Sequence, residues 1–256
     1  MAPMRLGDGT SLRAKGYSQV RKGDGTELWN AIPDSGVSRW TFDTADTENG
    51  VALDVWGEYD GDINGPTTGI PGANQTYDTN EAYEFDGDDD YIDYGDHSAH
   101  EFSSGQSFTF AFWQYQDSGS SNGSLITKGY GNPITNVDNQ PWYLSRTGQG
   151  GYAEFFLRDS NGADFKAQGN TDITDSWTHT VAVYDASASE LKLYVNGSIE
   201  DTVTGVSDDS YGQNSSPLVS GPHVGEYGGF KIDDLRIYSK PLTSTEVSNL
   251  YQSSSI

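Results

Sequence analysis

Short runs in which apolar and polar residues alternate recur along most of the chain. From residue 37 onward they are separated by clusters of Gly, Asp, Asn and Ser, and their period of two is that of a strand with one buried face. The clearest runs are SRWTFD, AYEFDG, YIDYG, SFTFAFWQY, SLITKG, PWYLSR, YAEFFLRD, WTHTVAVYD, LKLYVNG and GFKIDDLRIYS. Their spacing is typical of an antiparallel sandwich, so we predict an all-β body.

Within these runs the apolar residues fall on one face, which predicts the inner surface of a sheet. Trp40 and Phe42 alternate with polar residues. Two further same-face stripes are Phe108, Phe110 and Phe112, and Leu191, Leu193 and Val195. The pair Asn196-Gly197 follows the second stripe and predicts a hairpin turn there. We interpret the stripes as core and assign them no role in binding.

One helical signal lies near the end of the chain. In PLTSTEVSNLY, Thr243 and Glu246 have the spacing of a capping box, in which each side chain accepts a hydrogen bond from the other residue's backbone N–H. We therefore predict a short C-terminal helix after the strands.

The N-terminal region repeats one pattern, RLGDGTSL from Arg5 and RKGDGTEL from Arg21. Asp-Gly favours a two-residue hairpin turn, because both central positions of that turn need positive φ. We predict that both GDGT units are hairpin tips of a small β arm. The alternative is two exposed turns whose flanking residues are similar by coincidence.

The charge balance separates this arm from the body. Residues 1–36 hold five basic and four acidic residues, whereas the remaining chain holds nine basic and 34 acidic residues, a net of −25. An arm that lacks the acidity of its body is expected to be covered by partner subunits. We predict an anchoring or oligomerisation arm over residues 1–36 and a body over residues 37–256. The predicted apolar contacts of the arm are Leu12, Val20, Leu28 and Trp29.

The whole chain of 256 residues has a net charge of −24. The repulsion within such a chain is screened in concentrated salt, where the Debye length falls to about 3 Å at 1 M. We interpret the acidity as adaptation to a very salty medium, and an ordinary acidic surface protein is the alternative. Nucleic acid is not an expected partner, because phosphate contacts need clustered Lys and Arg.

Three further features of the sequence limit the chemistry and the cellular location that we expect. The chain has no cysteine, which excludes disulfides and thiolate chemistry. No window approaches the apolar length of a membrane span, so membrane insertion is not expected. The start, MAPMRLGDGTSLRAKG, lacks the apolar region of a secretory signal. If Met1 is the true start, we expect no export by a standard signal peptide.

The order of the motifs resembles that of laminin-G-like domains of the concanavalin A-like superfamily. The front half carries WTFD, AYEFDGDDDYIDYG, SFTFAFWQY and GSLITKG, and the back half carries DSWTHTVAVYD, LKLYVNG and IDDLRIYSKPLTSTEV. The resemblance covers roughly residues 37–252. It implies a two-sheet antiparallel jelly-roll sandwich of the kind found in lectins, adhesins and accessory carbohydrate-binding modules.

The segment DGDING predicts a cation site. It places Asp60, Asp62 and Asn64 at alternate positions before a glycine, as in the first half of a calcium loop. The twelfth position is Pro71 instead of the bidentate Glu, which excludes an EF-hand.

The resemblance adds two further ligands. Domains similar to this one often hold a structural Ca²⁺ through an early aspartate and one from the late ID strand, which match Asp54 and Asp233 here. We expect one structural Ca²⁺ as the cofactor of the chain, and the alternative is that these residues are solvated acids. The predicted ligands are Asp54, Asp60, Asp62, Asn64 and Asp233.

A second acidic cluster, Asp86 to Asp90, matches a turn between two strands in the family pattern. We expect its side chains to point outward, and a second metal site is the alternative. The nearest approach to the paired-acid motif of the superfamily's hydrolases is Glu84-x-Asp86-x-x-Asp89, which ends in Asp and lies at the wrong place. The four histidines are scattered, and His179 is expected to be packed in a strand. We therefore predict no enzymatic activity.

Sugar binding by jelly rolls uses loop aromatics that stack on pyranose rings, with polar side chains contacting hydroxyls. The aromatic candidates are Trp56, Tyr59, Tyr130, Trp142, Tyr143, Tyr211 and Tyr227. The long loop KGYGNPITNVDNQPWY adds Asn136 and Asp138, and loops of this length tend to be functional. The alternative for Trp142 and Tyr143 is that they open the next strand and face the core.

A lectin-like domain without an export signal is expected in a virus, whose particles assemble in the cytoplasm and are released. The leading hypothesis is a structural and adhesive protein on the virion surface of a halophilic archaeal virus: a tail fibre, spike or capsid decoration. Its expected partners are other virion proteins through residues 1–36, and host-surface glycan or S-layer glycoprotein. A homo-oligomer is expected, with a trimer as one option. The alternatives are a secreted or cell-surface adhesin module and a glycoside hydrolase.

Overall fold

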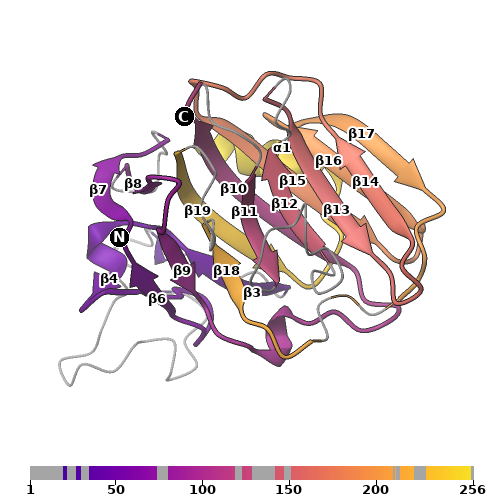
Figure 1. Cartoon of the computed structure of the whole chain (residues 1–256), viewed down its shortest axis with the longest axis horizontal. Coiled ribbons are helices and arrows are strands. Elements are labelled where there is room, and N and C mark those ends of the chain that lie inside the picture. The colour runs from indigo at the N-terminus through magenta and orange to yellow at the C-terminus, as the bar shows by residue number, and fades with distance from the viewer. Residues whose placement is uncertain are drawn as a thin grey trace.

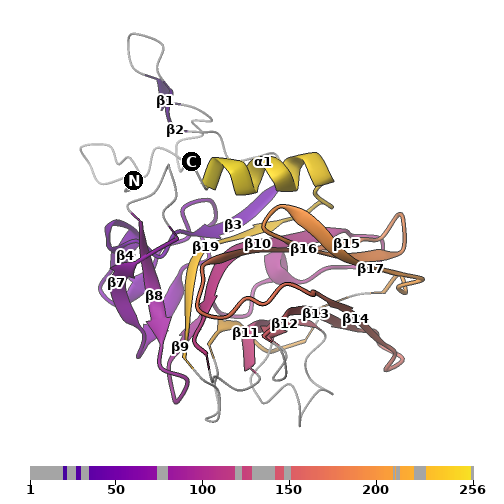
Figure 2. The ribbon, with the colours of Figure 1, turned by 90° about the horizontal axis from the view of Figure 1, so that it is seen from above.

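A computed structural model describes residues 20–21, 27–29, 35–73, 80–118, 123–128, 142–146, 151–209, 211, 214–221 and 229–254. Strands dominate, and two antiparallel sheets lie face to face (Figure 2). The fold is a concanavalin A-like jelly-roll sandwich, as predicted.

The first sheet contains eight strands in the described part of the chain. Its order is β17 (Ser198–Thr204), β16 (Glu190–Val195), β15 (Thr178–Asp185), β10 (Phe108–Gln116), β19 (Phe230–Tyr238), β8 (Glu81–Phe85) and β7 (Thr67–Pro71), with β3 (Gly36–Trp40) also paired to β19.

The second sheet contains nine strands within the same described ranges. Its order is β14 (Asp164–Gln168), β13 (Ala153–Arg158), β12 (Trp142–Arg146), β11 (Gly123–Lys128), β18 (Leu218–Ser220), β9 (Tyr91–Asp93), β6 (Gly61–Asn64), β5 (Val51–Ala52) and β4 (Thr47–Glu48). Figure 1 shows β11 to β14 side by side in front of the first sheet.

The core between the sheets is rich in aromatic rings, and the predicted stripes lie in it. Phe108, Phe110 and Phe112 from β10 are buried there, as are Leu191, Leu193 and Val195 from β16. Trp40 and Phe42 belong to the same cluster. The predicted hairpin is also present, since Asn196 and Gly197 both have positive φ between β16 and β17.

The central strand β19 changes partners along its length. Residues Phe230 to Ile232 pair with β8, and residues from Leu235 onward pair with β3. A bulge at Asp234, whose φ is 49°, separates the two segments. The buried Asp234 carboxylate accepts a 2.6 Å bond from Arg39 Nε and also pairs with Arg236. Although burial opposes ionisation, Arg236 and Arg39 hold the pKa of Asp234 below its ordinary range.

The C-terminal helix α1 (Ser244–Ser254) covers the outer side of the first sheet (Figure 2). A second apolar cluster lies beneath it and includes Val181, Val183, Tyr238 and Val247. The predicted capping box is confirmed: Thr243 N donates to Glu246 Oε2 at 2.8 Å, and Glu246 N donates to Thr243 Oγ1 at 3.3 Å. Two single 3₁₀ turns, η2 (Thr44–Asp46) and η3 (Ser98–His100), complete the described helical structure. Among the described residues, no helix has the length and apolar character that a bilayer span requires.

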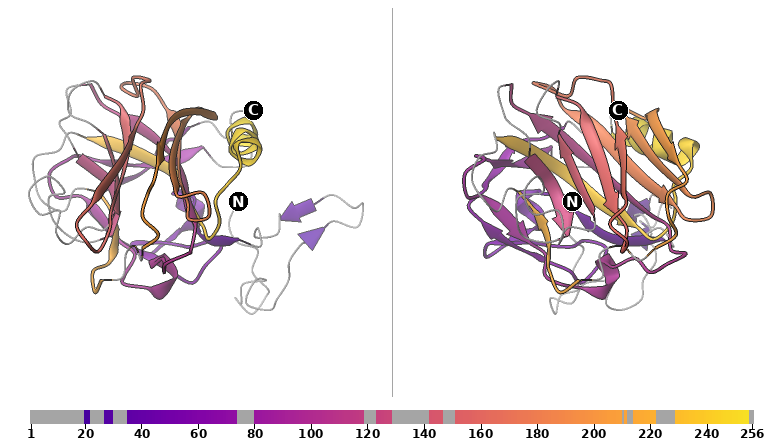
Figure 3. Two further views of the ribbon diagram at one scale, coloured as in Figure 1. Left: turned by 90° about the vertical axis from the view of Figure 1, so that its right-hand side faces the viewer. Right: turned by 45° about the vertical axis from the view of Figure 1, so that its right-hand side comes forward.

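The second GDGT unit lies between two short strands, β1 (Val20–Arg21) and β2 (Glu27–Trp29), which pair antiparallel as predicted for a hairpin. They form a sheet of their own, apart from the sandwich (Figure 3). The first GDGT unit and the side chains of Leu12, Val20, Leu28 and Trp29 lie outside the described residues.

Each predicted run contains a strand, but several short strands were not expected. β4 to β7 lie in a polar, Gly-rich stretch where alternation is weak, and β14 and β18 are also additional. The largest difference concerns DGDING, predicted as a metal loop. Its residues Gly61–Asn64 are strand β6, paired with β9.

His179 is packed in β15 as predicted, with its ring 5.2 Å from Trp113 and 5.9 Å from Tyr251. Burial lowers its pKa to about 3. His100 is also buried beside Ser38, and burial, aided by His97 and Lys128, lowers its pKa to about 3. Both rings are therefore neutral in the folded chain at pH 5, whereas exposed histidines with pKa near 6.5 would be protonated.

We predict that the chain loses stability as pH falls below about 6.5, because the unfolded state then binds protons that the folded state excludes. At pH 5, each of the two buried histidines lowers the free energy of unfolding by on the order of 2 kcal/mol relative to neutral pH. His179→Phe keeps a ring at the site but removes its titration. Thermal melting at constant NaCl should show a shallower loss from pH 7 to 5 in this variant than in the wild type. His97→Gln, at a partly exposed site, is the control, and an unchanged slope in His179→Phe would contradict the assignment.

Candidate functional site

The outer face of the nine-stranded sheet carries an aromatic pair. Side chains alternate along each strand, so Trp142 and Phe155 enter the core while their neighbours Tyr143 and Phe156 face outward. Tyr143 and Phe156 are direct cross-strand partners. Their rings stack with centroids 4.5 Å apart and planes 12° apart.

Charged side chains border this pair on strands β13 and β14. The Arg158 guanidinium carbon lies 5.6 Å from the Phe156 ring centroid. Arg158 forms a two-point contact with Asp164, from Nε to Oδ1 at 2.6 Å and from Nη2 to Oδ2 at 2.8 Å. On the other side, Lys166 Nζ lies 3.1 Å from Glu154 Oε2.

The Tyr143 hydroxyl joins the aromatic pair to these charges by donating to Glu154 Oε1 at 3.3 Å. Burial, reinforced by the Glu154 carboxylate, raises the pKa of Tyr143, so its phenol keeps the proton that it donates. We refer to this set as the β12–β14 platform. It comprises Tyr143, Glu154, Phe156, Arg158, Asp164 and Lys166.

Phe156 is only 6% exposed, so the platform offers the partly exposed ring of Tyr143 with hydrogen-bonding groups at its edge. The body of an aromatic ring can pack on the apolar face of a sugar, while carboxylates accept hydrogen bonds from hydroxyls and guanidinium or ammonium groups donate to them. Nothing in this arrangement requires a metal or a cofactor. The arrangement could hold a ligand rich in hydroxyls through ring packing and hydrogen bonds.

Three of the aromatic residues predicted for glycan binding are instead buried. Trp142 and Tyr211 have 0% of their surface exposed and lie in the main core. Trp56 is 8% exposed and packs beneath α1, with its ring 5.4 Å from Tyr238. A ring enclosed by protein cannot stack on a sugar, so these three predictions are wrong.

Tyr59 is partly buried, with its ring 4.9 Å from His97 and 5.1 Å from His100. The remaining predicted glycan ligands lie outside the described residues: Tyr130, Asn136, Asp138 and Tyr227. For the pair Trp142 and Tyr143, the core interpretation holds only for Trp142. Five members of the platform were not singled out from the sequence, although the adjacent residues Phe155 and Phe156 in a strand required one of them to face outward.

Asp54, predicted as a calcium ligand, instead holds a turn of its own backbone. Its Oδ1 accepts bonds from the N–H groups of Arg39 at 2.9 Å, Trp56 at 2.9 Å and Gly57 at 2.6 Å, and its Oδ2 accepts one from Tyr59 at 3.4 Å. A Cβ at Gly57 would lie 1.8 Å from Asp54 Oδ2, so only glycine fits there. Burial raises the pKa of Asp54, and the backbone N–H groups oppose that rise.

The predicted calcium ligands do not form one closely spaced group, although Asp60 lies beside Asp54. Asp60 accepts a bond from the Asp54 N–H at 2.8 Å, and Asp62 and Asn64 are exposed on β6. Asp233 accepts a bond from Ala73 N at 2.9 Å. None of the four aspartates belongs to the group of closely spaced acids found among the described residues. The predicted ligand set therefore does not fit a single ion, whereas calcium binding by the chain stays a prediction.

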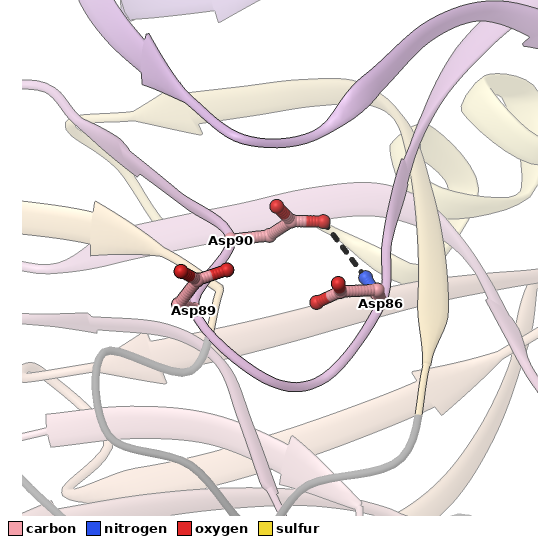
Figure 4. A group of neighbouring side chains, drawn as sticks. All are labelled: Asp86, Asp89 and Asp90. Carbon is pink, nitrogen blue, oxygen red and sulfur yellow. Dashed lines mark hydrogen bonds between the residues drawn. The ribbon is translucent and has the colours of Figure 1, made fainter.

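That group is Asp86, Asp89 and Asp90, in the predicted turn between β8 and β9 (Figure 4). The ligand oxygens of the three carboxylates lie within 4.8 Å of one another. Asp86 and Asp89 are exposed as expected, but Asp90 is buried, and its Oδ2 accepts a 2.8 Å bond from Asp86 N. Burial, with Asp86 and Asp89 adding to it, raises the pKa of Asp90. These bonds give Asp90 a role in shaping the turn.

We predict that Asp54→Ala lowers the free energy of unfolding by about 3 kcal/mol, since four backbone N–H groups lose their acceptor. Denaturant titrations in calcium and in chelator should give the same loss, because the role is structural. Asp62→Ala, which removes an exposed acid of the same segment, should change stability by no more than about 0.5 kcal/mol. A chelator effect that is present in the wild type and absent in Asp54→Ala would restore Asp54 as a calcium ligand.

Solved structures with this fold include toxin binding domains. The binding domain of Paraclostridial Mosquitocidal Protein 1 is 18% identical, with a TM-score of 0.63 over 86% of this chain and 52% of that one. The botulinum neurotoxin serotype D binding domain is 16% identical, with a TM-score of 0.63 over 86% and 51%. The serotype G domain is 15% identical, with a TM-score of 0.61 over 85% and 50%. The chain thus spans about half the length of these structures, and the likeness is one of fold.

No curated protein matches the chain in sequence. The family model named Laminin_G_3, described as the concanavalin A-like lectin/glucanases superfamily, matches residues 86–248. This range runs from the acidic turn after β8 to helix α1 and includes every member of the β12–β14 platform. The chain therefore belongs to the concanavalin A-like lectin/glucanases superfamily.

Proposed function

We propose that the chain is a lectin-like binding module that holds a glycan on the β12–β14 platform. The observation that carries this proposal is the partly exposed ring of Tyr143, which stacks on the buried ring of Phe156 and is bordered by two pairs of opposite charge. Tyrosine is enriched at interfaces, because its ring body is apolar and its hydroxyl can take a hydrogen-bond partner. The outer face of the eight-stranded sheet has less surface for a ligand, because α1 packs on it (Figure 2).

The similar structures support binding as the role. They are binding domains of toxins, and one is the botulinum neurotoxin serotype D ligand binding domain in complex with N-acetylneuraminic acid. That structure is 16% identical to the present chain, which matches 51% of its length.

We propose that the module is not an enzyme, although its superfamily includes glucanases. Retaining hydrolysis requires two carboxyls about 5–5.5 Å apart across a substrate cleft. Of the nearest candidate motif, Glu84 pairs with Lys231 at 3.2 Å, and Asp86 accepts a bond from Asp88 N within the turn. Both acids thus have structural partners. Release of reducing ends from a polysaccharide would favour the hydrolase instead.

A finer proposal concerns the setting of the module. We propose that it is the exposed domain of a structural and adhesive virion protein, a tail fibre, spike or capsid decoration, of a virus of halophilic archaea. The net charge of −24 and the separate β1–β2 hairpin support this setting. A secreted adhesin of a halophile is the alternative, and it would share the binding surface but not the anchoring arm.

We predict that Tyr143→Ala weakens glycan binding by about fivefold to tenfold, because stacking on an aromatic ring is worth on the order of 1 kcal/mol. A glycan array in about 3 M NaCl, chosen for the short Debye length, would identify a ligand, and calorimetry would give the affinities. Tyr115→Ala is the matched control. Tyr115 is a partly exposed tyrosine on the other sheet, with Lys231 Nζ 4.4 Å from its ring centroid. Equal losses in both variants would contradict the location of the site.

The arm proposal predicts a change of assembly state. In about 3 M NaCl the full chain should be an oligomer, whereas a chain lacking residues 1–34, which keeps Ser35 and the whole of β3, should be a monomer with the same melting temperature. Light scattering measures both masses. Monomers in both cases would favour the free-standing adhesin.

A further inference from the structure

We propose that the ligand of the β12–β14 platform is an uncharged glycan, and that Asp164 excludes acidic sugars by occupying the Arg158 guanidinium. This inference rests on the binding function proposed above and adds the chemical class of the ligand. It follows from how the cations of the body are paired.

The body is strongly acidic, so its few cations decide which charged ligands it can attract. Every cation after residue 36 whose side chain is described makes an ion pair with a carboxylate. The eight are Arg39, Lys128, Arg158, Lys166, Lys192, Lys231, Arg236 and Lys240. The described surface therefore presents paired cations amid an excess of carboxylates, which attracts no anion over distance.

The platform itself is neutral in sum. Arg158 and Lys166 contribute two positive charges, and Glu154 and Asp164 contribute two negative ones. The two halves differ in exposure. The Asp164 side chain is 47% exposed, whereas the Glu154 side chain is only 8% exposed.

Asp164 occupies the Nε–Nη2 edge of Arg158, one of the edges through which a guanidinium binds a carboxylate. A guanidinium recognises a carboxylate through two parallel N–H bonds, and Arg158 already makes that contact through Nε and Nη2. An acidic sugar would have to displace Asp164 or approach it as a like charge. A neutral sugar meets no such conflict, because the exposed Asp164 oxygens can accept bonds from its hydroxyls.

Lys166 also forms an ion pair within the protein, with Glu154. The nearly buried Glu154 carboxylate receives the Tyr143 hydroxyl and the Lys166 ammonium. Drawing Lys166 toward a ligand carboxylate would leave Glu154 without its counter-ion, and a buried charge that loses its partner is costly. This pair therefore supports the position of Tyr143 and does not serve an anion.

The test compares polymers that share a backbone sugar and differ in oxidation at C6, such as a soluble glucan and polyglucuronate, or a galactan and polygalacturonate. Binding of the full wild-type chain is measured by calorimetry in about 0.5 M and 3 M NaCl. We expect a neutral polymer to bind, with an affinity that changes little between the two salt concentrations. The matching uronate should bind at least about tenfold more weakly, because a like-charge contact opposes it.

Asp164→Asn removes the carboxylate from Arg158 with almost no change of shape. We expect it to raise the ratio of uronate to neutral affinity by about tenfold or more in 0.5 M NaCl, and by less in 3 M NaCl. Asp62→Asn is the matched control, since it removes the same charge from an exposed site on β6 of the same sheet. It should leave the ratio unchanged.

The outcomes distinguish failure of the uncharged-ligand proposal from failure of the proposed glycan binding. Wild-type preference for a uronate, or a ratio unaffected by Asp164→Asn, overturns the uncharged ligand while the binding function stands. An equal rise in the Asp62→Asn control would assign the effect to overall charge and would also overturn the role of Asp164. Failure of every neutral and acidic polymer to bind would overturn the proposed function and this inference together.

Discussion

Aromatic packing between the two sheets fixes the register of the long strands, and the outer surface depends on that register. A shift by one residue in β10 would turn Phe108, Phe110 and Phe112 out of the core between the sheets, so the loss of their packing opposes any slip strongly. The same constraint acts on β12 and β13, where Trp142 and Phe155 are held in the core. Tyr143 and Phe156 must then face outward and opposite each other. The platform is thus a consequence of the core beneath it.

The C-terminal part of the chain covers the outer face of the first sheet but not that of the second. β19 passes from β8 to β3 through the bulge at Asp234, whose charge is balanced by Arg39 and Arg236. The chain then turns into α1, which buries the apolar residues on the outer side of the first sheet. Among the described residues, α1 is the one α-helix, and it lies on the side of the first sheet that faces away from β11 to β14 (Figure 2). The aromatic and charged side chains of β12 to β14 are thus not under this helix.

The long strands and the helix could be predicted from sequence, because residues close together in the chain specify them. The candidate site could not, because it depends on which residues of neighbouring strands lie opposite each other. Strong alternation identified β10, β15 and β16, and the Thr243–Glu246 box located α1. DGDING was predicted as a metal loop but contains a strand, because polar residues at alternate positions are also the pattern of a strand with one exposed face.

The platform was harder to predict for a related reason. A sequence shows that neighbours such as Trp142 and Tyr143 face opposite ways, but not which one enters the core. The partners of Arg158 and Lys166 come from strand pairing and have no sequence signal. Buried Trp56 and Tyr211 show the same limit, because the elements that cover them lie far away in the chain.

The ion pairs on the platform have consequences for recognition that exceed their effect on stability. Exposed pairs contribute about 0–1 kcal/mol to folding, and concentrated salt weakens them further. A short-range geometric contact such as that of Arg158 with Asp164 nevertheless decides which groups a ligand can present there. Stacking on Tyr143 and hydrogen bonds to hydroxyls do not depend on long-range attraction, so they persist where screening is nearly complete. If the chain works in strong salt, as we propose, ring stacking and hydrogen bonds to an uncharged ligand are the contacts that would keep their strength there.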